Sequence, residues 1–182
     1  MTVNDARKDS ALKQKKGLHF ILASVIIWSL ITIVQATELP VLTKNLATFI
    51  ITAPLMPLAF LISKGIGVDF QNKGNPLTHL GILFSLNQMI YLIIAMWIYP
   101  TIPEMMLMVV AIIFGAHLLP YGWLYRSRAY TVLSVFIPLL ALTLGLMFEP
   151  VVLGLSMVVV EIVFSLLLIA EVRTLRKEAF ET

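Results

Sequence analysis

Cysteine is absent from the 182 residues of the chain, and charged residues make up only 13% of them. Without a thiol the chain has no disulfide, no thiolate metal site and no cysteine nucleophile. Soluble domains carry about a quarter charged residues. The low charge, the 59% of hydrophobic residues and the mean hydropathy of +0.95 are therefore typical of a protein that crosses a membrane several times. Such a chain has no room for a soluble catalytic domain.

Long apolar stretches between charged residues predict an all-α integral membrane bundle of six transmembrane helices. Each stretch can cross a hydrocarbon core of about 30 Å at about 1.5 Å per residue. A basic tail over residues 1–16 and a second tail over residues 173–182 flank a membrane domain over residues 17–172. The predicted spans are residues 17–37, 45–63, 78–99, 105–125, 129–148 and 150–171.

The distribution of charge predicts that both termini are cytoplasmic. With the N-terminus inside, every lysine and arginine except Lys44 lies on the cytoplasmic side, and Glu38, Glu104 and Glu149 mark the outer turns. Basic residues concentrate in the cytoplasmic loops of membrane proteins. We therefore expect a multi-pass protein of the cell (inner) membrane, whose basic residues set its orientation and do not bind nucleic acid.

Prolines inside the predicted spans mark places where the helices can bend. Pro54 and Pro57 fall in the second span, Pro120 in the fourth and Pro138 in the fifth. Because proline removes a backbone hydrogen bond, the pair in the second span is the strongest candidate for a break. Two halves of three spans would have opposite orientations, and both middle spans contain proline. This arrangement is that of a 3+3 inverted repeat.

An ionisable side chain, Glu161, lies in the middle of the sixth span. An ionised carboxylate at that depth costs about 2.5–3.5 kcal/mol, so the group either stays protonated or meets a partner inside the bundle. His117 lies near the same depth in the fourth span, and a neutral imidazole can accept a hydrogen bond from a carboxylic acid. Intramembrane carboxylates commonly mark a transport path or a proton relay. We therefore predict a functional Glu161–His117 pair.

The third span adds polar side chains at the same level. Asn87 and Gln88 lie near its middle, and Gln88 belongs to a stripe of mostly small residues that predicts close helix packing. We expect both amides to line a central site, with Tyr91 and Tyr121 as walls that have a polar tip. Hydrogen bonds that merely join helices are the structural alternative for the amides.

Two arginines, Arg126 and Arg128, stand in the short turn between the fourth and fifth spans. They can contact an anionic headgroup or a substrate phosphate, and setting the orientation explains them as well. The three histidines have no regular spacing, so we expect neither a metal ion nor a haem, and no other cofactor.

Three segments carry a resemblance to a known family: Asn75-Pro76-Leu77, Asn87-Gln88 and the run from Gly115 to Trp123. The layout resembles a family of small, uncharacterised six-helix bacterial membrane proteins, over most of the chain. The resemblance implies a fold and no activity.

Together these features predict a small transporter or permease for a small molecule or ion, coupled to protons through Glu161 and His117. The expected partners are the bilayer, the substrate and, because six helices form a small bundle, a second copy in a homodimer. A membrane-embedded enzyme acting on lipid is one alternative, with His117 and Glu161 as an acid–base pair and Arg126 and Arg128 holding a headgroup. A structural or accessory subunit, whose polar layer only locks the bundle, is the other.

Overall fold

The computed structural model describes residues 1–180, with side chains up to Glu178. This part of the chain contains helices and no strand, which confirms the prediction of an all-α protein. The helices are α1 (Val3–Lys13), α2 (Leu18–Gln35), α3 (Val41–Thr52), α4 (Leu55–Gly65), α5 (Thr78–Thr101), α6 (Met106–Ala116), α7 (Leu119–Leu124), α8 (Arg128–Met147) and α9 (Pro150–Phe180), with short 3-10 turns at η1 (Lys15–Gly17) and η2 (Pro103–Met105).

Five helical segments are long and apolar enough to cross a membrane. They are Lys15–Gln35, Thr78–Thr101, Pro103–Leu124, Arg128–Met147 and Pro150–Glu178. The pair α3 and α4 passes the same test as one unit, bent by 42°, and then makes a sixth span. The sequence predicted six spans with a break in the second, and the bent pair lies where that break was expected.

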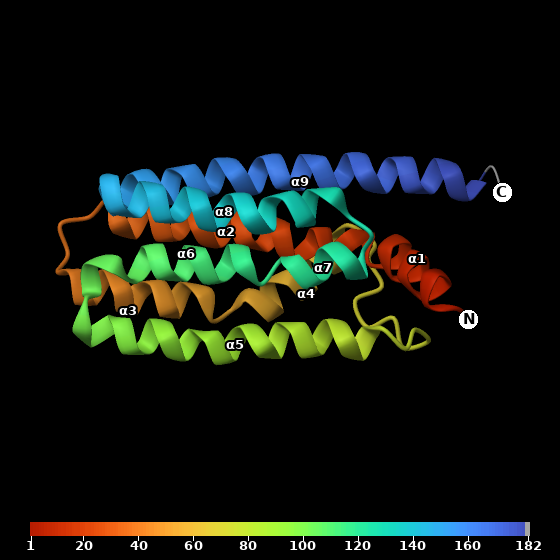
Figure 1. Cartoon of the computed structure of the whole chain (residues 1–182), viewed down its shortest axis with the longest axis horizontal. Coiled ribbons are helices and arrows are strands. Elements are labelled where there is room, and N and C mark those ends of the chain that lie inside the picture. Colours follow the sequence, from red (N-terminus) through yellow and green to blue (C-terminus); the bar gives the residue numbers. More distant parts are fainter. Residues whose placement is uncertain (181–182) are drawn as a thin grey trace.

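The helices form an elongated bundle with both termini at the same end (Figure 1). Helix α2 packs along α9, and α6 packs along α8. Glycines allow both approaches, because a Cβ atom at Gly154 would lie 2.6 Å from the Thr32 hydroxyl, and one at Gly115 would lie 2.5 Å from Cδ of Pro138. Helix α5 is the least buried of the five spans.

Helix breaks occur in the second and fourth predicted spans. Ala53 and Pro54 separate α3 from α4, and Pro57 lies in the first turn of α4, where its missing N–H is not needed. His117 and Leu118 separate α6 from α7 just before Pro120. Pro138, by contrast, stays inside the continuous helix α8. Both middle spans contain proline, but only the second span is broken at it. The inverted repeat therefore stays a prediction.

The described parts of both predicted tails contain helix. Helix α1 starts with a capping box, in which the Thr2 hydroxyl accepts from the Asp5 N–H at 3.2 Å and the Asp5 carboxylate accepts from the Thr2 N–H at 2.9 Å. Ala6, Ser10 and Ala11 are buried, so α1 packs on the end of the bundle. Helix α9 runs on to Phe180, past the predicted end of the last span at residue 171. The tail boundaries themselves stay predictions. The sequence did not predict α1, because a short polar helix lacks the apolar signal of a span.

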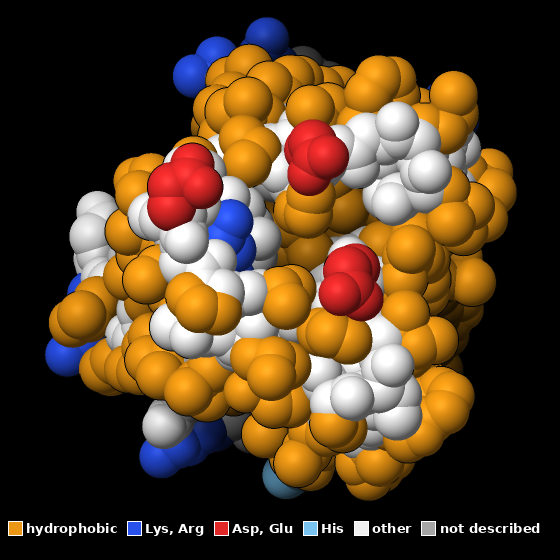
Figure 2. Space-filling model, turned by 90° about the vertical axis from the view of Figure 1, so that its left-hand side faces the viewer, with side chains coloured by type: hydrophobic (Ala, Val, Ile, Leu, Met, Phe, Trp, Pro, Cys, Tyr) orange, Lys and Arg blue, Asp and Glu red, His pale blue; other side chains and the backbone are white. Residues whose placement is uncertain are grey.

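Charge separates the two ends of the bundle. The turns at one end carry Glu38, Glu104 and Glu149, and Figure 2 shows three acidic side chains there on a largely hydrophobic face. We call this the acidic end. The other end holds α1, the α4–α5 loop, the α7–α8 turn and the end of α9, and we call it the basic end.

Candidate functional site

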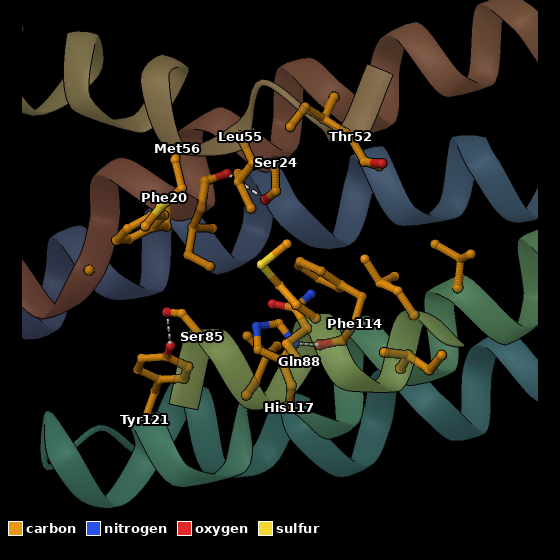
Figure 3. A pocket seen from close by; sticks show the side chains of 18 of the residues that line it. Phe20, Ser24, Thr52, Leu55, Met56, Ser85, Gln88, Phe114, His117 and Tyr121 are labelled. Atoms are coloured by element: carbon orange, nitrogen blue, oxygen red, sulfur yellow. Dashed lines mark hydrogen bonds between the residues drawn. The ribbon is translucent and has the colours of Figure 1, made fainter. Parts of the chain in front are cut away.

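A pocket of about 410 Å³ opens between the helices beside the break that separates α3 from α4. Its walls come from α2, α3, α4, α5, α6 and α7, with Tyr130 added from α8. Figure 3 shows side chains of α2, α3 and α4 on one side and those of α5, α6 and α7 on the other, all directed toward the space between them. The pocket therefore forms where two broken spans and the loosely packed α5 leave a gap in the bundle.

The walls are mostly apolar and contain no lysine, arginine, aspartate or glutamate. Polar groups come from Ser24 on α2, from Ser85 and Gln88 on α5, and from His117 and Tyr121 at the α6–α7 break. Ser85 Oγ and the Tyr121 hydroxyl lie 2.7 Å apart and hydrogen-bond to each other. His117 Nδ1 is bonded to the carbonyl of Phe114. The Gln88 amide takes part in none of the hydrogen bonds found within residues 1–180, so it is available to a ligand.

Glu161 lies directly behind the wall of the pocket. Its side chain is 0% exposed, and Oε2 is hydrogen-bonded to Ser24 Oγ across the α2–α9 contact. Ser24 Oγ also donates to the carbonyl of Ile21 at 2.8 Å. The second carboxyl oxygen of Glu161, Oε1, is buried without a hydrogen-bond partner among the described residues. Ser24 is thus the link between the carboxyl group and the pocket.

The structure separates Glu161 from His117, which the sequence predicted to be a pair. Glu161 Oε2 bonds to Ser24, whereas His117 bonds to Phe114 and packs its ring 6.0 Å from that of Tyr121. The sequence predicted the pair from a shared depth along the helices, and depth does not fix the direction in which a side chain points.

The two neighbouring amides of α5 also diverge. Gln88 lines the pocket, while Asn87 is exposed and donates to the hydroxyl of Tyr91, also exposed, at 2.9 Å. Asn87 and Tyr91, which the sequence predicted to line the site, are not among the residues that line this pocket. Consecutive residues of a helix point about 100° apart, so Asn87 turns away where Gln88 faces in. Tyr121 does line the pocket, next to Tyr125 and Tyr130, whose rings lie 6.0 Å from its own.

Sequence reasoning missed Ser24, Tyr125 and Tyr130 as part of the site. Ser24 lies about midway along the first span, at a depth that matches Glu161, but a serine in a span commonly bonds only to its own backbone. The two tyrosines appeared to be interfacial residues at the ends of their spans. The sequence signal that could have identified Ser24 is a small polar residue at the depth of the Glu161 carboxyl group.

Arg126 and Arg128 lie at the basic end, away from this pocket. They line a second, more open cavity of about 330 Å³ between α7 and α8. Both side chains are exposed. Within residues 1–180 no three metal-binding side chains of His, Asp or Glu come together.

A protein-family model described as a family of unknown function (DUF7010) matches residues 3–171. The chain belongs to this family. The match covers α1, the pocket and the Ser24–Glu161 contact, so all of these fall inside the family's domain. No curated protein and no solved structure matches the chain.

Proposed function

We propose that this DUF7010 protein is a small membrane transporter or permease that carries a neutral, largely apolar small molecule through the pocket between α2 and α5. The observation that carries the proposal is a pocket of about 410 Å³ within the membrane-spanning part of the bundle, lined by polar groups but by no charged residue. Ligand sites of about this size with a few convergent polar groups are typical of small-molecule binding.

The wall chemistry defines the substrate class. A charged ligand would lose its hydration and find no counter-charge, which is costly in a low-dielectric site. A neutral molecule with one or two hydrogen-bonding groups would instead meet Gln88, Ser85 and His117, and its apolar part would pack on Trp28 and Phe114. We therefore expect uncharged aromatic or terpenoid-like compounds to bind better than their ionised relatives.

The pocket supports entry from the side. Met56 on α4 and Ile82 and Met89 on α5 line it, yet all three are exposed, Met89 to 64%. Exposed lining residues on two adjacent helices indicate an opening toward the bilayer, where apolar compounds concentrate. The breaks at Pro54 and at His117 supply points about which the helices on either side of the pocket can rock.

Glu161 is the group that we expect to carry a proton during transport. Ser24 has one hydroxyl proton, and it lies within hydrogen-bond distance of two oxygens, those of Ile21 and Glu161. If that proton goes to the Ile21 carbonyl, the Glu161 carboxyl must donate its own proton to Ser24, so the pair holds a proton beside the pocket. A ligand that bonds to Ser24 would change this arrangement and the protonation of Glu161.

The charge pattern supports the orientation that the sequence predicted. The basic end carries both termini and faces the cytoplasm in this proposal, with the acidic end outside and the bundle in the cell membrane. An enzyme acting on lipid receives less support, because the acid–base pair that it needs, His117 and Glu161, is not assembled.

The test uses purified protein in liposomes that contain a pH-sensitive dye and carry an imposed pH gradient. Adding indole, naphthol or menthol, which are neutral, should speed the collapse of the gradient relative to protein-free liposomes. Glu161→Gln keeps the shape of the side chain but cannot exchange a proton, so it should abolish this effect. A pH gradient that collapses equally fast without any added compound, or one that no compound affects, would contradict the transporter proposal and favour an accessory subunit.

A further inference from the structure

A second site lies at the basic end, where α7 turns into α8. The cavity of about 330 Å³ is lined by Gly122, Arg126, Ser127, Arg128, Thr131 and Val132. Gly122 makes it possible for the two helices to meet here, since a Cβ atom would lie 2.5 Å from the Thr131 hydroxyl. Val132 is exposed and belongs to a membrane-spanning helix, so the cavity reaches from the polar boundary toward the lipid.

The positive charge in this cavity is not balanced by the protein. Within residues 1–180 the ion pairs are Lys13–Asp9 and Lys16–Glu171, so neither Arg126 nor Arg128 has a carboxylate partner. The nearby Glu171 is occupied, because its Oε2 accepts from Lys16 at 2.8 Å and its Oε1 accepts from the Ala129 N–H at 3.0 Å. Two arginines without a carboxylate partner among the described side chains therefore line the cavity.

A third arginine joins them from a distant part of the chain. Arg7 of α1 donates from Nε to the carbonyl of Trp123 at 2.8 Å, and its guanidinium lies 4.5 Å from the centre of the Trp123 ring. The pKa of Arg7 is lowered, first by partial burial and second by the charge of Arg126. Like charges are thus held close to each other, which is unfavourable unless an anion lies between them.

The backbone at this turn is also held in an unusual conformation. Arg126 has a φ of 50°, in the left-handed region that non-glycine residues seldom adopt. Trp123 beside it is exposed, and tryptophan is typical of the headgroup layer of a membrane. The left-handed residue ends α7 as at many helix C-termini, with the Ser127 N–H bonded to the Gly122 carbonyl at 3.0 Å. Trp123 alone marks the turn as a place where the protein meets the membrane boundary.

We propose that this cavity binds the phosphate of an anionic phospholipid in the leaflet that meets the basic end, with Arg126 and Arg128 as the main ligands and Arg7 as a third cation. Guanidinium groups match the oxygens of a phosphate, and the exposed apolar surface around Val132 accommodates the start of an acyl chain. The bound lipid would then join α1 to the α7–α8 turn. This inference does not depend on the transport activity proposed above.

The test compares wild type with the double variant Arg126→Asn/Arg128→Gln, in which asparagine tolerates the left-handed backbone. The matched control is Arg173→Gln/Arg176→Gln, which removes two exposed arginines of α9 and the same net charge. Purified protein receives phosphatidylglycerol, phosphatidylcholine or inorganic phosphate. Native mass spectrometry measures retained lipid, and the unfolding temperature measures the stabilisation.

Phosphatidylglycerol should stay bound to wild type and to the control, and it should raise the unfolding temperature of both. The double variant should bind it more weakly, on the order of tenfold. Arg7→Gln should weaken binding less. If the control binds phosphatidylglycerol as weakly as the double variant, the lipid is attracted to surface charge in general. If wild type binds phosphatidylcholine as well as phosphatidylglycerol, the cavity does not recognise charge. If inorganic phosphate raises the unfolding temperature as much as phosphatidylglycerol does, the cavity is a site for a free anion. Each of these three results would overturn the proposal.

Discussion

Ser24 on α2 and Glu161 on α9 share a hydrogen bond in the interior of the bundle, and Ser24 alone of the two lines the pocket. Through this contact the carboxyl group of Glu161 lies one side chain away from a ligand in the pocket, while Glu161 itself stays buried. It also joins two helices that pack closely at Gly154, about two turns nearer the acidic end. The central claim, that the pocket binds a substrate whose presence Glu161 senses, rests on this relationship.

The Ser24–Glu161 bond should contribute measurably to stability. A double-mutant cycle of Ser24→Ala, Glu161→Leu and the combined variant should give a coupling free energy of about 0.5–2 kcal/mol, as for other hydrogen bonds between membrane helices. Ser24→Ala alone should cost about 1–3 kcal/mol, because it leaves a buried carboxyl oxygen without its partner. Reversible unfolding in mixed detergent provides the measurement. Additive effects of the two substitutions would mean that the bond is not formed.

The close approach of α2 and α9 depends on the absence of a side chain at residue 154. Gly154→Val should destabilise the protein by about 1–3 kcal/mol, since the added atoms would overlap Thr32. Gly65→Ala is the matched control, because a Cβ atom there meets nothing within 4 Å. The control should leave the free energy of unfolding unchanged or raise it by a few tenths to about 1 kcal/mol. Equal losses in both variants would contradict the packing described here.

Helix α1 is held to the α4–α5 loop by Asp9, which pairs with Lys13 at 2.7 Å and accepts from Asn72 at 3.0 Å and Asn75 at 2.8 Å. Partial burial opposes ionisation of this carboxyl, but the bonds from Lys13, Asn75 and Asn72 outweigh it and hold its pKa below the ordinary value of 3.8. Because the pKa is lowered in the folded state, the stabilisation is present above pH 3.8 and is lost as the pH falls through the folded pKa.

Asp9→Asn should therefore loosen α1 at neutral pH and have little effect in acid. Hydrogen–deuterium exchange of residues 3–13 should be several-fold faster in Asp9→Asn than in wild type at pH 7. The difference should shrink as the pH falls from 3.8 through the lowered pKa of the folded state, because the wild-type carboxyl is then protonated. Exchange that is the same in both proteins at pH 7 would show that Asp9 does not anchor α1.

The sequence predicted an all-α chain with long apolar helices well, because the length of an apolar stretch can be read directly from the sequence. The break that it predicted in the second span falls at Ala53 and Pro54, whereas Glu161 is the twelfth of the 31 residues of α9, because the helix runs on past the predicted span. The sequence could not orient side chains around the helix axes. Asn87 and Gln88 are adjacent in sequence and have the same chemistry, yet only the packing of α5 decides which of them faces the pocket.

The sequence also could not predict which residues form pairs between helices. Glu161 pairs with Ser24 because α9 packs along α2. The depth of Ser24 in its span is a signal, but it does not say which two helices are neighbours. Helix α1 was missed because its polar composition is that of a tail, although Thr2 and Asp5 have the spacing of a capping box, which was a readable sign of a helix start.

The most direct test of the central claim is the unfolding temperature of the purified protein with indole and its ionised relatives. Wild type, Gln88→Leu and Asn87→Leu form a matched set, because one amide lines the pocket and its neighbour does not. A ligand present at about 100 times its Kd adds about 2.7 kcal/mol of stability. The account predicts that indole raises the unfolding temperature of wild type and Asn87→Leu by several degrees, that Gln88→Leu loses most of this gain, and that indoleacetate and tryptamine have little effect. No shift with indole, naphthol or menthol, or equal shifts in all three proteins, would contradict it.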